Sequence, residues 1–311
     1  ADKELLEDTK NALSSTKVEG NGIATAAAVA ANNNTVKADE AVVNKLNAVA
    51  GNTTATAENT NIVIQTYMDM TITGVDASSE KKTITVDIQP MYRTVATTAD
   101  VKNGGEIVLK GDESKAVNAV QIGNPQKLAV SGETTVSIQL PTGFVTDATA
   151  KIFVQHKGYE YEATVTKDDG VYTATFTNPH GFSPFTISMT SQAVAQIGET
   201  KYTSLQDAVN AVENNGTIEI VGGTSPYTGT ANKTFTVKNS TSADITVNGQ
   251  TIKPTESYTF KYTHSSGGSS GGSSSGSSSG LRASRLGSRP KITRSGSWVR
   301  KRTFITWSNS L

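Results

Sequence analysis

The sequence contains no cysteine. This excludes disulfide bonds, thiolate metal sites and a cysteine nucleophile. It also contains no apolar run of about 18 residues, the length that a helix needs to cross a membrane. The apolar stretch at 23–31 is too short, and its side chains are too small. The sequence therefore predicts no transmembrane segment.

Arginine and tryptophan are almost missing from most of the chain. The first 280 residues hold one arginine, Arg93, and no tryptophan, whereas 281–311 hold both tryptophans and eight basic residues but no acidic one. Removing these eight from the 28 basic residues leaves 20 against 28 acidic residues before position 281, a net charge of −8. The formal net charge of zero thus joins two segments of different composition.

Threonine, asparagine, serine, alanine and valine dominate what is present, and leucine is scarce. Branched side chains at Cβ fit a pleated surface, so this composition favours β structure. The sequence predicts a mainly β protein with an N-terminal helical segment, an antiparallel Ig-like β-sandwich, a short β-solenoid-like region and a disordered tail.

The helical segment is predicted over 1–58, where apolar residues recur at helical spacing. A second helix is expected to start after Thr35 as its cap, with Asp39 and Glu40 in its first turns, and to end at Gly51. Its apolar stripe is interpreted as a packing surface rather than a partner-binding face. The residues of the two stripes are Leu5, Leu6, Ala12 and Leu13, then Val42, Val43, Leu46 and Val49.

The sandwich is predicted over 59–194, because the apolar period changes to two from Ile62 onward. Polar loops at 76–82 and 167–170 predict hairpins, and strands recur at about ten-residue spacing, as in antiparallel sandwiches. The expected strands are 62–72, 84–88, 135–140, 151–156, 159–166, 171–177 and 185–189.

The solenoid-like module is predicted over 195–263. Ser204 is expected to cap a helix, with Asp207 at the capping-box position and a stop at 214–216. Short strands broken by glycine and asparagine come next, which is typical of the capped start of a β-solenoid. They are expected at 217–221, 235–237, 245–247 and around Tyr258, Phe260 and Tyr262.

The remaining chain divides into a Ser/Gly linker at 264–280 and a basic tail at 281–311. Serine and glycine cannot bury a core, so the linker is predicted to be flexible. The tail interleaves its charges with aromatic residues, which is also typical of binders of nucleic acid or anionic membranes. It has no clean helical stripe, however, and we expect it to be disordered.

The segment NPHGFSPF at 178–185 is the strongest candidate for chemistry. His180 has no second histidine at metal-ligand spacing, and Ser183 does not stand in a GxSxG nucleophile elbow. We interpret the segment as a rigid corner in which Pro179 and Pro184 fix the backbone while Phe182 and its neighbour Phe185 plug the sandwich. Catalysis and ligand contact are the alternatives.

Other motifs carry little chemistry. Two Gly-Gly pairs, at 104–105 and 222–223, lack the phosphate-binding GxxxxGK pattern. The acidic turn at 168–170 lacks the further carboxylates of a calcium loop. Paired carboxylates for glycoside hydrolysis meet in space, so they stay open here. The sequence predicts no catalytic, cofactor-binding or metal-binding residue, no cofactor and no enzyme.

Several segments resemble modules of multidomain cell-surface proteins of Gram-positive, clostridia-like bacteria. The most specific are NPHGFSPF and the YTSLQDAV run at 202–209, and the resemblance covers roughly 60–262. It implies an Ig-like β module followed by the start of a β-solenoid. It also implies an extracellular location, at the cell surface or in the cell wall, and it transfers no catalytic residue. The wall anchors common in such proteins, an LPxTG motif or S-layer homology segments, do not occur in this sequence.

The leading hypothesis is therefore a non-enzymatic surface module with a structural or adhesive role. The alternative is a carbohydrate-binding or carbohydrate-processing surface protein, because tyrosines can stack on sugars. Host or cell-wall glycans or proteins are candidate partners, the tail is a candidate contact for anionic wall polymers, and no nucleic-acid partner is expected. The candidate glycan contacts are Tyr202, Tyr227, Tyr258 and Tyr262.

We predict that 281–311 is not a native functional element. A repetitive Ser/Gly coding tract favours a frame slip, and an out-of-frame reading changes composition abruptly. Translating the source DNA beyond the linker in the other two frames should yield a plausible surface-protein module. If neither frame does, and the tail binds teichoic acid or anionic vesicles with a steep salt dependence, the prediction is wrong.

Overall fold

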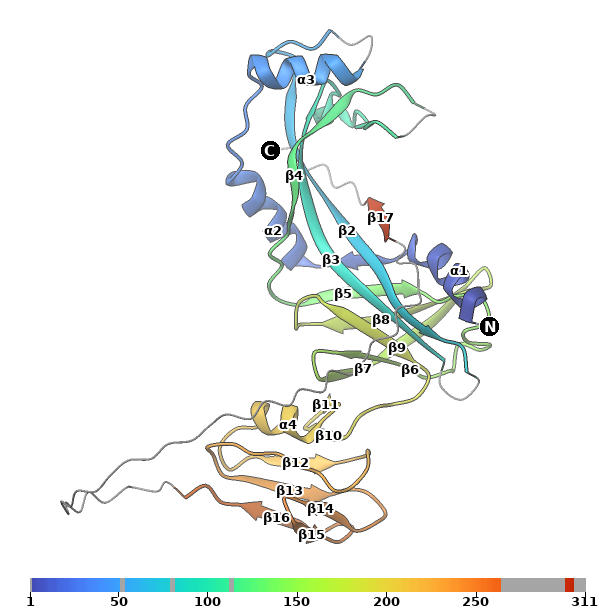
Figure 1. The fold of residues 1–311 in the computed structure, drawn as a ribbon, viewed down its shortest axis with the longest axis vertical. Coiled ribbons are helices and arrows are strands. Elements are labelled where there is room, and N and C mark those ends of the chain that lie inside the picture. The colour runs from blue at the N-terminus through green and yellow to red at the C-terminus, as the bar shows by residue number, and fades with distance from the viewer. Residues whose placement is uncertain (1, 51–53, 79–81, 112–114, 264–299, 305–311) are drawn as a thin grey trace, which may run out of the picture.

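The computed structural model describes residues 2–50, 54–78, 82–111, 115–263 and 300–304. It is mainly β with a helical part at the N-terminus, as predicted (Figure 1). Within the described residues no helix combines the length and apolar character needed to span a membrane. The helices are α1 (Asp2–Leu13), α2 (Asn21–Asn32), α3 (Glu40–Ala50), the 3-10 helix η1 (Val101–Asn103) and α4 (Leu205–Ala211).

The strands follow the predicted alternation, with six additions that the sequence patterns did not indicate: β1, β4, β10, β11, β15 and β17. The first nine are β1 (Lys17–Glu19), β2 (Asn61–Asp76), β3 (Thr83–Thr97), β4 (Ala119–Lys127), β5 (Thr134–Gln139), β6 (Ile152–His156), β7 (Tyr159–Asp168), β8 (Val171–Asn178) and β9 (Pro184–Ser188). The others are β10 (Ala195–Ile197), β11 (Thr200–Tyr202), β12 (Thr217–Ile220), β13 (Phe235–Asn239), β14 (Ile245–Val247), β15 (Gln250–Ile252), β16 (Ser257–Phe260) and β17 (Arg300–Phe304).

Strand β7 joins two antiparallel layers. Its first half, Tyr159–Ala163, pairs with β6, and its second half, Thr164–Asp168, pairs with β8. One layer runs β1–β5–β8, and the other runs β6–β9–β3–β2. The connection between β8 and β9 therefore carries the chain from one layer to the other.

A single hydrophobic core lies between these layers. Ile84, Val86 and Ile88 alternate along β3 with polar residues, and each is at most 1% exposed. They share a cluster with Val136 of β5 and Phe176 of β8, so apolar side chains of both layers meet. Burying one such side chain contributes roughly 1.5–3 kcal/mol, which makes the period-two pattern decisive for the layer arrangement.

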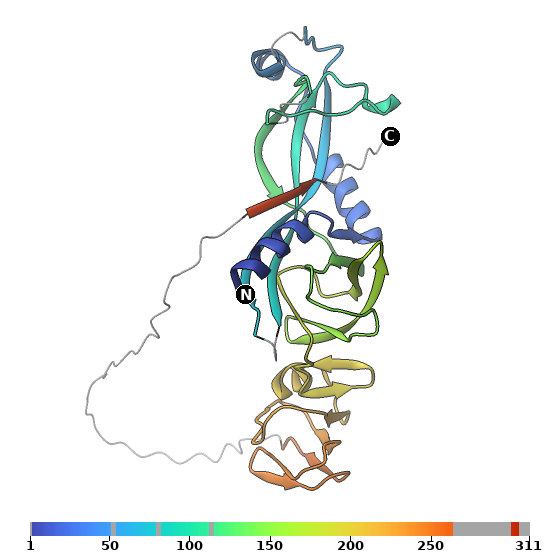
Figure 2. The same ribbon diagram turned by 90° about the vertical axis from the view of Figure 1, so that its right-hand side faces the viewer.

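The hairpin of β2 and β3 is longer than the core that it helps to form. Both strands run beyond the two layers and reach α3 and β4 at the other end of the molecule (Figures 1 and 2). Helices α1 and α2 lie along β2 and contribute Leu5, Leu13, Ile23 and Ala26 to the core. The apolar stripe of α1 is thus a packing surface.

Helix α3 begins later than predicted. Asp39 caps it, since its Oδ1 accepts a hydrogen bond from the backbone N–H of Val42 at 2.9 Å, so the expected cap Thr35 is wrong. A carboxylate at this position satisfies a free N–H and favours the helix dipole. Val42 and Leu46 are buried, which confirms packing for this stripe, whereas the expected stop at Gly51 lies outside the described residues.

Helix α4 of the C-terminal module is capped as predicted. Ser204 Oγ accepts from the Asp207 N–H at 3.1 Å and donates to its carboxylate at 2.5 Å. Strands β12 and β13 are parallel, the arrangement of stacked solenoid strands, but β16 is antiparallel to β13 and β14 pairs antiparallel with β15. A second, separate core holds the module together, with Ile218 and Val237 both 0% exposed.

Five residues of the predicted disordered tail form strand β17, so disorder was wrong for them. This strand pairs antiparallel with β2, with Arg302 opposite Asp69 (Figure 2). The linker at 264–280 and the rest of the tail at 281–311 lie outside the described residues.

Candidate functional site

The corner between β8 and β9 is built around the side chain of Asn178. Asn178 is fully buried; its Nδ2 donates to the Gly181 carbonyl at 2.7 Å, and its Oδ1 accepts from the His180 N–H at 3.1 Å. The amide therefore closes a local turn that backbone bonds alone would leave open. Gly181 sits at φ 71°, a region that glycine enters without strain.

His156 lies under this turn, at the end of β6, and is only 2% exposed. Its Nε2 is 3.0 Å from the Gly181 carbonyl, and its Nδ1 is 3.3 Å from the Pro184 carbonyl and 3.2 Å from Ser183 Oγ. A neutral ring has one N–H, and the shorter contact favours its place on Nε2. The imidazole also stacks on Phe185, with ring centroids 4.0 Å apart.

His180 lies on the outer side of the same corner and is half-buried. Its ring stacks on Tyr159 at 3.6 Å between centroids, and its Nδ1 is 2.6 Å from the Tyr161 hydroxyl. Its carbonyl accepts from Lys157 Nζ at 2.8 Å. Burial, and then the nearby Tyr159, raise the pKa of Tyr161, so this hydroxyl stays protonated and donates to the ring.

Both histidines are held in the neutral state. Burial is the main cause that lowers the pKa of His156, and the charge of Lys157 adds to it, while the backbone carbonyls of Pro184 and Gly181, which would both accept from a protonated ring, oppose it. Burial, then Lys157, also lowers the pKa of His180. Neutral imidazoles can donate to carbonyls without placing a charge in the protein interior.

The corner contains a serine–histidine pair, which joins Ser183 to His156 and not to His180, its neighbour in sequence. Ser183 Oγ contacts His156 Nδ1 instead, and the other ring nitrogen faces the Gly181 carbonyl. A hydrolytic triad needs a carboxylate there to stabilise the imidazolium. A buried ring that faces a neutral carbonyl lacks that support, so the pair orients the loop rather than activating the serine.

The two phenylalanines of the corner differ in burial. Phe185 is fully buried and belongs to the main core, as predicted. Phe182 is only partly buried and packs against the core from outside, with its ring edge-on to Phe185 at 6.2 Å. The interpretation of both as plugs therefore holds fully for Phe185 alone.

Glu160 ties the two-layer body to the C-terminal module, and sequence reasoning missed it. Glu160 as a whole is 4% exposed, and its carboxylate accepts from Ser191 Oγ and the Gln192 N–H, both at 2.5 Å, and from Gln155 Nε2 at 3.0 Å. A glutamate in an alternating strand has the pattern of an outward-facing charge. Only the fold reveals that the chain after β9 returns across it.

The four tyrosines named as candidate glycan contacts do not gather into one site. Tyr202 and Tyr227 are 6% and 7% exposed, and both belong to the core of the C-terminal module. Tyr258 and Tyr262 keep 42% of their surface exposed, at the last strand of that module. Only this second pair presents surface on which a sugar could stack.

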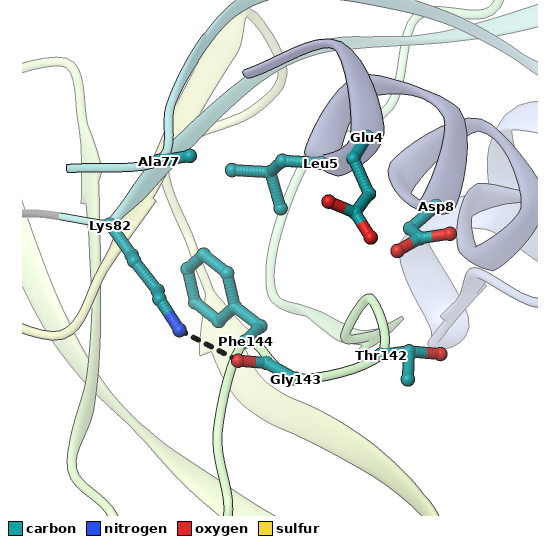
Figure 3. Close-up of a pocket in the computed structure, with 8 residues that line it drawn as sticks. All are labelled: Glu4, Leu5, Asp8, Ala77, Lys82, Thr142, Gly143 and Phe144. Atoms are coloured by element: carbon teal, nitrogen blue, oxygen red, sulfur yellow. Dashed lines mark hydrogen bonds between the residues drawn. The ribbon is translucent and has the colours of Figure 1, made fainter. Parts of the chain in front are cut away.

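A hollow lies elsewhere, between α1, the β2–β3 loop and the loop at 141–144 (Figure 3). It measures about 260 Å³, below the roughly 300 Å³ at which small-molecule sites begin. Glu4 and Asp8 lie on one wall, while Lys82 Nζ across from them donates to the Gly143 carbonyl at 2.7 Å.

The charged groups of this hollow do not converge on one point. Its two carboxylates stand one helical turn apart on the same helix, and the opposing cation is engaged by a carbonyl. In the part of the chain that the structure describes, no three histidine, aspartate or glutamate side chains converge as metal ligands.

A comparison with family models, curated proteins and solved structures finds no significant match to this chain.

The corner predicts unequal costs for its two phenylalanines. Phe185→Ala should lower the free energy of unfolding by about 3–5 kcal/mol, because it opens a cavity in the core. Phe182→Ala, the matched control, should cost clearly less, since its ring is partly exposed. Denaturant unfolding measures both, and equal losses would contradict this account of the corner.

The neutral, buried His156 predicts a pH-dependent stability. Its pKa lies below the ordinary 6.5 in the folded state, so below pH 6.5 the unfolded chain binds more protons and stability falls. The melting temperature should drop between pH 6.5 and 5, above the range in which carboxylates titrate. His156→Gln keeps a donor but does not titrate, so it should reduce this drop, and the lowered pKa of His180 accounts for the part that remains. An unchanged pH profile in this variant would refute the role assigned to His156.

Proposed function

We propose that this protein is a non-enzymatic structural or adhesive module of the bacterial cell surface. The supporting observation is that every polar side chain of the corner is engaged within the protein. The side chains of His156 and Asn178 bind the Gly181 carbonyl, and that of His180 binds the Tyr161 hydroxyl. The residues that could perform chemistry thus hold the loop and the strands together. In this proposal the fold bears mechanical force and performs no chemical reaction.

The finer architecture belongs to the same proposal. We assign the two layers to an Ig-like sandwich and the C-terminal module to a short solenoid start. Antiparallel layers joined by a strand that changes partners support the first assignment, and the parallel pair of β12 and β13 behind a capped helix supports the second. Both agree with the resemblance to surface proteins of Gram-positive bacteria.

An extracellular location at the cell surface or wall is part of this proposal. The absence of cysteine leaves stability to the two buried cores, which form without an oxidising environment. The basic tail is then a candidate contact for anionic wall polymers, since eight positive charges without an acidic residue attract a polyanion.

Carbohydrate binding is the second candidate function. The observation in its favour is the exposure of Tyr258 and Tyr262 at one end of the molecule. Aromatic rings with one open face stack on the apolar side of sugars, and two of them can bind a chain of sugar units.

The two functions make opposite predictions on a glycan array probed with the full chain. A structural module should give no reproducible signal for any glycan class. A signal confined to one class, lost in Tyr258→Ala and Tyr262→Ala but kept in Tyr172→Ala, would establish carbohydrate binding instead. Tyr172 is a suitable control because it lies in β8, in the two-layer body.

A further inference from the structure

Strand β16, the last of the C-terminal module, exposes side chains on the same face of the sheet on which its neighbour β13 is buried. Tyr258 and Phe260 of β16 lie opposite Val237 and Phe235 of β13, so all four side chains share one face. Val237 and Phe235 are 0% and 3% exposed, whereas Tyr258 keeps 42% of its surface exposed. The core face of the sheet is therefore uncovered at β16.

The backbone of β16 also has an unused side. Among the described residues β16 pairs only with β13, and it ends the long sheet. Asn239 of β13 directs its N–H toward β16, where it donates to the Glu256 carbonyl at 2.9 Å. The backbone groups of alternate residues in a strand point to the same side, so the N–H and C=O of Val237 also face β16. The N–H and C=O of its partner Tyr258 therefore face β13. Thr259 therefore directs its N–H and C=O away from β13.

The sequence that directly follows the module offers no apolar side chain to cover this strand. Residues 265–280 are all serine or glycine. The apolar residues beyond them include Phe304, but β17 is placed on β2, at the opposite end of the sheet. An uncovered apolar face next to an open strand edge is a template for another strand.

We propose that β16 is a self-association site, at which β16 of a second copy adds antiparallel to extend the sheet. A two-fold axis through Thr259 places this residue opposite its own counterpart, with outward backbone groups facing each other. The same register sets Tyr258 of one copy opposite Phe260 of the other. Two aromatic pairs then cover the exposed face, and each contributes beyond its buried area.

A second copy fits this surface better than a glycan does. Tyr258 already contacts Phe260 edge-on, with ring centroids 4.9 Å apart and planes at 63°, so the two rings do not form one flat platform for a sugar. A glycan would also leave the outward backbone groups of Thr259 to water. This inference rests on the geometry of β16 alone. If it fails, the proposed structural role is unaffected, because the glycan array tests that role separately.

The full chain should therefore dimerise reversibly in sedimentation equilibrium over roughly 1 µM to 1 mM. Thr259→Pro removes the outward N–H and should abolish the dimer, because proline cannot donate to the new ladder. Tyr258→Ala should weaken it at least about ten-fold. Thr236→Ala is the matched control: it removes the side-chain hydrogen bond to Thr259, 2.9 Å in the native protein, and should leave the dimer intact.

The register has its own test, for which the absence of cysteine provides a clean background. Under mild oxidation Thr259→Cys should form a disulfide-linked dimer much faster than Ser257→Cys, because the two-fold axis brings only position 259 opposite itself. Thermal melts of each variant check that it folds. A chain that stays monomeric up to 1 mM, or equal cross-linking at both positions, would overturn the proposal.

Discussion

The turn between β8 and β9 is the constraint on which the two-layer body depends, because there the chain passes from one layer to the other. Asn178 and His156 hold this turn from inside, and both satisfy the Gly181 carbonyl. A buried carbonyl without partners would cost about 1–3 kcal/mol, so polar side chains in this apolar setting stabilise the crossing. The adjacent Phe185 can then enter the core that both layers share.

Buried polar groups also connect the body to the C-terminal module. Glu160 accepts the hydrogen bonds of the returning chain at Ser191 and Gln192, and β7 pairs with β11, where Tyr159 lies opposite Tyr202. Strand β7 thus contacts both layers and the next module. One strand with three sets of partners couples the stability of these parts.

Local signals made much of this fold predictable from sequence. Alternation identified β5, β7 and β8 nearly to the residue but gave only the first part of β3, which runs on to Thr97, and the Ser204–Asp207 capping box located α4. Burial of charged or polar groups was not predictable, because Glu160 and His156 look like any polar residue of a strand until distant segments fold over them. The cap of α3 failed for a related reason: Thr35 and Asp39 are both good caps, and only tertiary packing selects where the helix starts.

The sheet has two ends, and they differ in a way that bears on the tail. At one end β17 pairs with β2, and this pairing uses backbone groups that almost any extended segment can supply. The register of this pairing sets Arg302 opposite Asp69. Backbone pairing therefore agrees with either origin of the tail, native or out of frame. At β16 specificity resides in aromatic side chains of the folded module itself, so any association there belongs to the module and does not depend on the origin of the tail.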